Sequence, residues 1–157
     1  MPRPVVPISR LAAHPKLVPE LANWFKTEWP GWYGPGGSGI AENDLLACAN
    51  EGSLPLGVVA FRDSEPCGVA ALKAESIPSH SHLQPWASAG FVKPALRGQG
   101  IGAALLSALE REARILGFSR IYCGTNTAAS LLARLGWSFI EAADREGKEI
   151  AIYEKVL

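Results

Sequence analysis

The residues with the clearest chemical potential lie at positions 97–102, where the sequence reads Arg-Gly-Gln-Gly-Ile-Gly. An apolar stretch at 87–92 precedes this segment, and a long amphipathic helix pattern follows it. Because glycine has no Cβ, a turn of this kind can fold closely around a phosphate and direct backbone N–H groups at it. The first N–H groups of a helix have no partner within the helix, and the helix dipole adds partial positive charge there. The sequence therefore predicts a site for a phosphorylated ligand.

Three glycine motifs compete to describe this site. The P-loop motif fails because no Gly-Lys-Ser/Thr follows. Gly98, Gly100 and Ala103 match the dinucleotide fingerprint G-x-G-x-x-G/A, but residues 93–96 separate the strand from the glycines. The acidic residue that a dinucleotide site needs about 20 positions later is absent, since residues 120–123 are Arg, Ile, Tyr and Cys. A dinucleotide-binding oxidoreductase is therefore the weaker alternative.

The third motif, R-x-x-G-x-G, agrees with both the residues and their context. Residues 92–106 closely resemble the acetyl-CoA-binding motif of the GNAT N-acetyltransferase superfamily. Residues 135–137, Leu-Gly-Trp, resemble the turn that follows the fourth helix of that family. The order of elements also fits from about residue 4 to the C-terminus. The resemblance implies an acyltransferase that uses acetyl-CoA and no metal.

The resemblance also implies which residues contact the cofactor. The backbone amides of the glycine run would hold the pyrophosphate, and the strand at 90–92 would pair with the pantetheine arm. Arg97 has two interpretations, a partner for phosphate or an anchor for the loop, and the motif favours the first. Asn126 and Thr127 start a predicted helix, where capping is the first interpretation and cofactor contact the second. The expected cofactor residues are Gly90, Phe91, Val92, Arg97, Gly98, Gln99, Gly100, Ile101, Gly102, Ala103 and Asn126.

The surrounding pattern predicts an α/β domain of the α+β type spanning residues 1–157. We expect a GNAT-like central sheet of about seven strands, mixed but mostly antiparallel, with helices on both faces. In chain order we expect a strand at 3–9, a helix at 14–28, a glycine-rich loop at 29–39, a helix at 40–51, strands at 54–61, 67–75 and 85–92, a helix at 99–116, a strand at 119–123, a helix at 128–135, and strands at 137–143 and 148–156.

The implied reaction is direct attack of an amine on the acetyl thioester. It requires an unprotonated amine, a donor for the developing oxyanion and a proton for the departing thiolate. In the family a backbone N–H on the fourth strand polarises the thioester carbonyl, here near Phe91 and Val92. Many members place a tyrosine acid four residues before the glycine of the Leu-Gly-Trp turn, but that position is Leu132 here. The usual acid is therefore missing.

Other groups are candidates for the proton transfers. Tyr122, Ser130, Cys123 or water could protonate the thiolate, although Tyr122 and Cys123 are equally suited to filling the core. A thiolate with a pKa near that of free cysteine, about 8.5, needs no strong acid. Glu75, at the end of the predicted third strand, is the candidate base, and its alternative interpretation is an ordinary exposed carboxylate.

Two histidines in the following loop could also accept a proton, because imidazole titrates near neutral pH. The spacing of His80 and His82 would suit a metal, but no third ligand follows at a recognisable spacing. We therefore predict no metal site.

The acceptor is expected to contact the first helix–loop–helix, by resemblance to the family. Trp29, Trp32 and Tyr33 stand beside flexible glycines and could form an apolar lid over the acceptor. Glu75 is also expected to contact the acceptor. The alternative is a surface loop that these aromatic side chains hold against the core.

Composition limits the classes of partner. The chain has 157 residues, 48% of them hydrophobic, and 15 basic side chains balance 15 acidic ones, so neither nucleic acid nor an anionic membrane is expected as a partner. Residues 1–16 contain four prolines and no apolar stretch, unlike a signal peptide, and no segment approaches a membrane span. Three cysteines without C-x-x-C spacing suggest buried thiols in a reducing compartment. We expect a cytoplasmic protein, with a homodimer anticipated from the family alone.

These observations favour an N-acetyltransferase that acts on a primary amine of a small molecule or peptide, in a ternary complex with acetyl-CoA. The alternative is an acyl-CoA-binding regulatory or vestigial module without efficient transfer, which the leucine at position 132 motivates.

Overall fold

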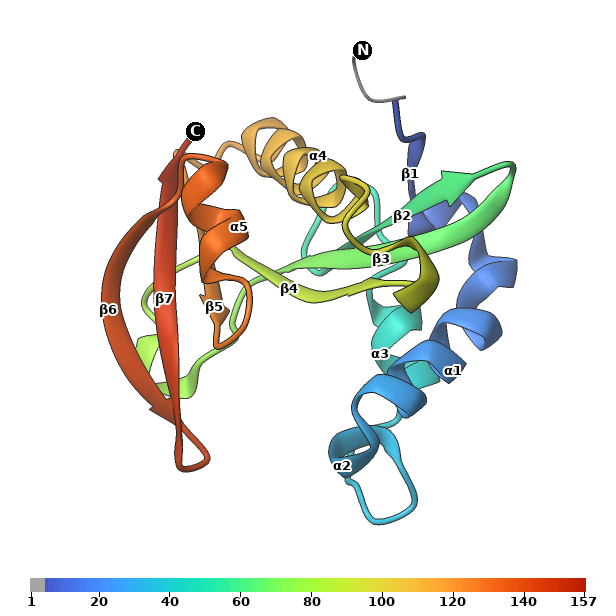
Figure 1. Ribbon diagram of the computed structural model, residues 1–157, viewed down its shortest axis with the longest axis horizontal. Coiled ribbons are helices and arrows are strands. Elements are labelled where there is room, and N and C mark those ends of the chain that lie inside the picture. The colour runs from blue at the N-terminus through green and yellow to red at the C-terminus, as the bar shows by residue number, and fades with distance from the viewer. Residues whose placement is uncertain (1–4) are drawn as a thin grey trace.

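The computed structural model describes residues 5–157. Within that range seven strands form one mixed sheet in the order β1-β2-β3-β4-β5-β7-β6, and only β4 and β5 run parallel (Figure 1). The strands are β1 (Ile8–Arg10), β2 (Leu56–Arg62), β3 (Glu65–Lys73), β4 (Trp86–Val92), β5 (Arg120–Thr125), β6 (Ser138–Arg145) and β7 (Lys148–Val156).

Helices cover both faces of this sheet, as the sequence predicts. The α-helices of the described chain are α1 (Val18–Glu28), α2 (Pro30–Tyr33), α3 (Ala41–Ala47), α4 (Ile101–Ile115) and α5 (Ala129–Arg134). The 3₁₀ turns are η1 (Leu11–Ala13), η2 (Pro15–Leu17), η3 (Pro78–His80) and η4 (Pro94–Leu96).

Two apolar layers hold the helices on the sheet. On one face, α4 packs through residues spaced by about one turn, among them Ile101, Leu105 and Leu109, which are at most 2% exposed. Leu132 of α5 joins this layer. On the other face, α1 and α3 pack against alternate residues of β2 and β3, because successive side chains of a strand point to opposite faces. The two layers fix α4 and α1 on opposite sides of β4.

Most predicted elements are confirmed, and β7 has the predicted bounds. The first strand is shorter than predicted: residues 1–4 lie outside the described part of the chain, and β1 begins at Ile8. The first helix starts with the 3₁₀ turn η2 and becomes α-helical only at Val18. The predicted loop at 29–39 contains the short helix α2, which follows Pro30, a residue suited to a first helical turn.

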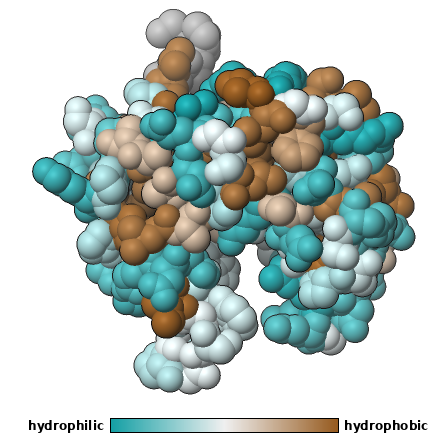
Figure 2. Space-filling model, turned by 180° about the vertical axis from the view of Figure 1, so that it is seen from behind, coloured by the Kyte–Doolittle hydropathy of each residue, from teal (hydrophilic) through white to brown (hydrophobic). Residues whose placement is uncertain are grey.

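In the view of Figure 1, the lower half of the molecule divides into two parts. Figure 1 shows α1, α2 and α3 on one side and the β5–β7–β6 part of the sheet on the other, with β4 between them. Seen from behind, the molecular surface has an open notch between the two lower lobes (Figure 2). The candidate site lies where β4 and β5 separate.

Candidate functional site

The glycine run forms a left-handed turn that leads into α4. Gly98 has a φ of +80°, and Gly100, the N-cap of α4, has a φ of +88°. A side chain disfavours this backbone region by about 1–2 kcal/mol, so glycine is required here by conformation. A Cβ built at Gly98 would meet no atom within 4 Å, which leaves the outer surface of the turn open to a ligand.

The N-terminus of α4 presents unpaired donors beside this turn. The first helical hydrogen bond runs from the Ala104 N–H to the Gly100 carbonyl, at 3.1 Å. The N–H groups of Ile101, Gly102 and Ala103 therefore have no acceptor inside the helix. Within the described chain no side chain caps this end of α4. The predicted anion site thus has open N–H donors and the positive end of a 15-residue helix.

Next to this turn, β4 separates from β5. The two strands pair only at Trp86–Tyr122 and Ala87–Cys123, so the remainder of β4 has no β5 neighbour. The Lys93 N–H donates to the Cys67 carbonyl of β3 at 2.9 Å. Because backbone groups of successive strand residues point alternately to the two sides, the polar groups of Val92 face away from β3, into the split. The Val92 N–H there is available to an extended ligand, whereas the Val92 carbonyl accepts a hydrogen bond from Arg97.

A β-bulge lies at the start of the split. Ser88 pairs with Ala71 and Phe91 with Val69, so two residues of β4, Ala89 and Gly90, oppose one residue of β3. Ala89 has a φ of +53°, a strained conformation for a residue with a side chain. Bulges of this kind redirect the backbone and are frequent beside active sites. A Cβ at Gly90 would meet no atom within 4 Å, so this stretch of backbone is also accessible.

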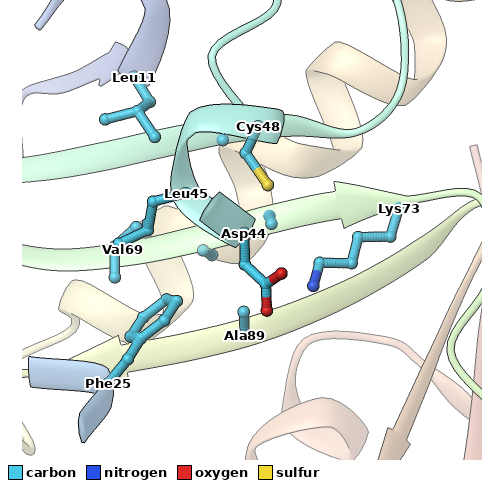
Figure 3. Close-up of a pocket in the computed structure, with 11 residues that line it drawn as sticks. Leu11, Phe25, Asp44, Leu45, Cys48, Val69, Lys73 and Ala89 are labelled. Carbon is cyan, nitrogen blue, oxygen red and sulfur yellow. The ribbon is translucent and has the colours of Figure 1, made fainter. Parts of the chain in front are cut away.

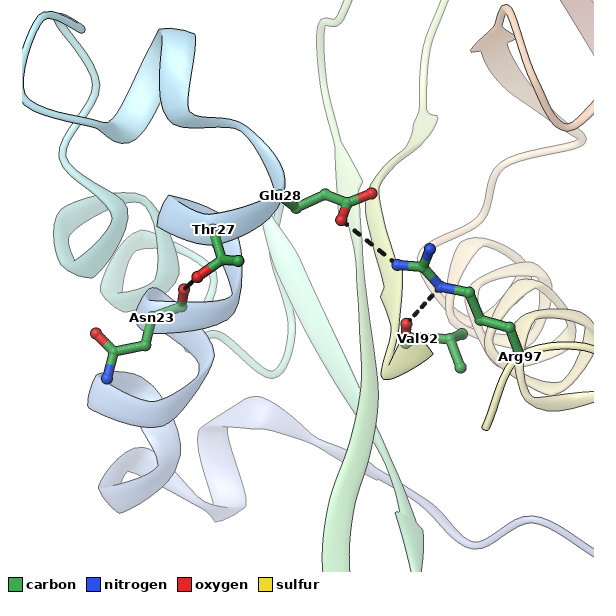
Figure 4. Close-up of polar contacts among 5 residues, drawn as sticks. All are labelled: Asn23, Thr27, Glu28, Val92 and Arg97. Carbon is green, nitrogen blue, oxygen red and sulfur yellow. Dashed lines mark hydrogen bonds and ion pairs between the residues drawn. The ribbon is translucent and has the colours of Figure 1, made fainter. Parts of the chain in front are cut away.

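Arg97 connects the turn to both neighbouring elements. Its Nε donates to the Val92 carbonyl at 2.8 Å, and its Nη2 lies 3.4 Å from Glu28 Oε2 at the end of α1 (Figure 4). The guanidinium also lies 5.4 Å from the centre of the Phe91 ring. Gln99 accepts a hydrogen bond from Arg62 of β2. The anchoring interpretation of Arg97 therefore has direct structural support, and its Glu28 contact is exposed enough for an anion to replace it.

The predicted catalytic side chains do not form one acid–base group. Glu75 was predicted to end a strand, but β3 ends at Lys73 and Glu75 is exposed in the loop beyond it. Tyr122 is 8% exposed, with its ring 5.7 Å from that of Trp86, and faces the α1–α3 side of the sheet. Ser130 is exposed on α5, on the opposite side of the sheet. Tyr122 and Ser130 therefore cannot act as one pair.

The other proton-transfer candidates are also constrained. Burial raises the pKa of Cys123 to about 12, so its thiol stays protonated at neutral pH. Leu132, at the position of the expected tyrosine, is 1% exposed within the core. His80 is held in a polar chain, with Nδ1 2.7 Å from the Ser79 hydroxyl and Nε2 2.8 Å from Glu141 of β6. These contacts link the loop of His80 to β6.

Two further predictions concern ions and the start of α5. No group of three or more metal-binding side chains occurs among residues 5–157. The capping role expected for Asn126 and Thr127 is wrong: the Thr125 hydroxyl accepts hydrogen bonds from the N–H groups of Thr127, at 3.1 Å, and Ala128, at 2.8 Å. Asn126 is exposed, and its contact with the cofactor stays a prediction. Within residues 5–157 no helix has both the length and the apolarity to cross a membrane.

The aromatic segment at 29–33 is packed on α1 more firmly than a flexible lid would be. The rings of Trp29 and Tyr33 lie 5.0 and 5.7 Å from that of Phe25, and only Trp32 is largely exposed, at 49%. The Tyr33 hydroxyl donates to Asp44 Oδ2 of α3 at 2.6 Å. Burial and this carboxylate raise the pKa of Tyr33.

Sequence reasoning missed two charged residues that share a pocket on this side of the sheet, Asp44 and Lys73. The sequence does contain a signal for Asp44: it lies three residues after Ala41 and four before Cys48, on the helix face that those buried residues define. Lys73 likewise continues the alternation of Val69 and Ala71, which face α1 and α3.

Comparison with known proteins decides the family. The sequence model of the Acetyltransferase (GNAT) family matches residues 18–137. The chain belongs to this GNAT family. A comparison with curated proteins gives no significant match.

Several solved structures share the fold of this GNAT protein. An aminoglycoside 6'-N-acetyltransferase complexed with coenzyme A is similar with a TM-score of 0.76 at 16% identity, over 96% of each chain. A ribosomal-protein-alanine N-acetyltransferase from Brucella melitensis gives a TM-score of 0.72 at 21% identity, over 96% of this chain and 99% of the other. A protein from Salmonella typhimurium solved with acetyl-CoA gives 0.66 at 16% identity, over 98% and 94%. These TM-scores show that the chain shares the fold of the three structures.

Proposed function

We propose that this GNAT protein transfers the acetyl group of acetyl-CoA to a primary amine of a small molecule or peptide, by direct attack in a ternary complex. One observation carries the proposal: the left-handed glycine turn and the open N–H donors of α4 lie beside the stretch of β4 that has no β5 partner. A phosphate site and a free strand edge are the two contacts that an acyl-CoA needs.

The chain's own backbone would hold the acyl donor. The N–H groups of residues 98–103 would bind the pyrophosphate, with Arg97 free to exchange Glu28 for a phosphate oxygen. The stretch of β4 at residues 90–92 would lie along the pantetheine arm as a neighbouring strand would, while the Val92 carbonyl keeps its hydrogen bond from Arg97. Gly90 and Gly98, where an added Cβ would meet nothing, would keep the approach to both contacts open.

Acetyl-CoA supplies the activated acetyl thioester, and the chain supplies position and charge stabilisation. We assign the outward Val92 N–H as donor to the thioester oxygen, because a fixed backbone donor placed where negative charge develops lowers the barrier. Glu75, exposed in the loop two residues beyond β3, remains our proposed base, acting directly or through water. Tyr122, Ser130 or water would return a proton to the thiolate, since Leu132 has no proton to give.

The acceptor class follows by analogy with the relatives. Similar structures are described as enzymes acting on an aminoglycoside and on a ribosomal-protein alanine, which supports a small-molecule or peptide amine. Trp29, Trp32 and Tyr33 would border that acceptor on the α1–α2 side. We also propose that the chain forms a single domain, assembles as a homodimer and has no nucleic-acid partner.

Two measurements test this function in order. Thermal unfolding with acetyl-CoA, CoA and NAD should show a higher melting temperature with the first two only, because a ligand that binds the folded state stabilises it. Release of free thiol with a panel of primary amines should then exceed hydrolysis without amine. A shift with CoA but no amine-dependent thiol release would support the alternative, a CoA-binding module. A shift with NAD alone would refute the site.

A further inference from the structure

A pocket lined by two opposite charges opens on the face of the sheet that carries α1 and α3. Asp44 of α3 and Lys73 at the end of β3 both point toward Ala89, the bulge residue of β4 (Figure 3). Among the ion pairs of the described chain there is none between Asp44 and Lys73, nor any other that involves Lys73. Within the described chain, no ion pair of 4.0 Å or less therefore involves either charge, and both side chains line the pocket.

The position of the carboxylate is fixed. The Tyr33 hydroxyl binds Asp44 Oδ2 at 2.6 Å, and the Tyr33 ring is itself stacked on Phe25. This contact uses one carboxylate oxygen and leaves Oδ1 able to accept hydrogen bonds from a ligand. A charged side chain held in this way loses little entropy when it binds.

The shape of the pocket limits what can enter. Its inner end is a cavity of about 10 Å³ that reaches Ala89, which lies on β4 three residues before Val92. Outside it lies a hollow of about 230 Å³, large enough for a small organic molecule. Asp44, Cys48 and Lys73 line both spaces, and the remaining walls of the hollow are the apolar or backbone surfaces of Ala47, Pro55 and Ala74.

We propose that this hollow binds the acceptor as a zwitterion, an amine that also carries a carboxylate, such as a small α-amino acid. Within the hollow, the Asp44 carboxylate binds the ammonium group on the side toward Ala89, Lys73 binds the carboxylate, and the apolar part of the ligand lies against Ala47, Pro55 and Ala74. The bound ammonium must lose its proton before the amine attacks the thioester. The amine is then the ligand group nearest the bulge in β4. The assignment of this ligand as acceptor rests on the proposed function, whereas its binding does not.

The test uses three ligands with the same carbon skeleton: L-leucine carries both charges, L-leucinamide only the ammonium and 4-methylpentanoate only the carboxylate. Each is titrated calorimetrically into the protein saturated with CoA, and into the protein alone. L-leucine should bind at least about tenfold more tightly than either analogue, because each analogue lacks one charge-assisted contact. Equal affinity for L-leucine and L-leucinamide would overturn the role of Lys73, and no binding of L-leucine up to millimolar concentration would overturn the whole inference.

Matched variants assign the two contacts. Lys73→Met should weaken L-leucine about tenfold and leave L-leucinamide unchanged, and Asp44→Asn should weaken both amines but leave 4-methylpentanoate unchanged. Lys148→Met and Asp63→Asn, at exposed positions away from the pocket, remove the same charges and should change nothing. Equal losses for all ligands in Lys73→Met would indicate a purely structural lysine and overturn the proposal.

The zwitterion site and the transferase function can be refuted independently. Binding of CoA without L-leucine would refute the zwitterion site and leave the transferase proposal standing. Binding of L-leucine without CoA would do the reverse.

Discussion

Replacing Gly98 by glutamate tests the anion site, and the same substitution at Gly117, at the other end of α4, is the control. Gly98 precedes α4 and Gly117 follows it, with φ values of +80° and +93°, and a Cβ at either position would meet no atom within 4 Å. Gly98→Glu and Gly117→Glu should therefore carry the same backbone cost, about 1–2 kcal/mol each. The helix dipole adds about 0.3–1 kcal/mol against a carboxylate at the C-terminal end and favours it at the N-terminal end. Gly98→Glu should thus be the more stable of the two variants.

Binding of CoA should show the opposite order. Two like charges about 4 Å apart repel by about 1 kcal/mol in water and about 4 kcal/mol at an effective dielectric constant of about 20. A carboxylate beside the pyrophosphate should therefore raise the Kd for CoA by at least about tenfold in Gly98→Glu, whereas Gly117→Glu should bind as the wild type does. Calorimetric titration with CoA measures the affinity of each variant, and denaturant unfolding measures the difference in their stability. Wild-type affinity in Gly98→Glu, or equal losses in both variants, would refute the placement of the pyrophosphate.

Three further changes test other parts of the site. Glu28→Gln should alter stability by less than about 1 kcal/mol, as is usual for an exposed ion pair. It should leave CoA affinity equal or higher, because it frees Arg97 for phosphate. Weaker CoA binding in a titration would contradict that role of Arg97. Leu132→Tyr should raise the rate of thiol release if a missing acid limits turnover, at a stability cost of about 1–3 kcal/mol for overpacking the core; an unchanged rate in the folded variant would assign the proton to water or another donor. The pKa of Cys123 is raised in the folded state from an ordinary value of 9.0 to about 12, so its thiol ionises first in the unfolded chain. The free energy of unfolding should therefore be unaffected by this group below pH 9 and fall as the pH rises from 9 toward 12, and the fall should be smaller in Cys123→Ala; identical pH slopes in chemical denaturation would show that the thiol is not desolvated.

The sequence alone determined the parts of this protein that depend on local chemistry. The turn at 97–102 could be assigned because only glycine adopts left-handed backbone without cost, and both Gly98 and Gly100 do so. The spacing of apolar residues along 101–115 predicted the buried face of α4, and alternation predicted β7 with its observed bounds. Each of these signals lies within a few residues of the structure it specifies.

The tertiary structure decided how separate segments meet. The bulge at Ala89 and the end of the β4–β5 pairing depend on strand register, which partners distant in sequence determine. Asp44 and Lys73 come from a helix and a strand that the sequence gives no reason to align, and they share a pocket because both lie on the face that packs against α1 and α3. Glu75 is the opposite case, a predicted site residue that is exposed to solvent because it lies two residues beyond the end of β3. Backbone conformation is a local property that a short sequence encodes, whereas convergence of side chains depends on the packing of the whole chain.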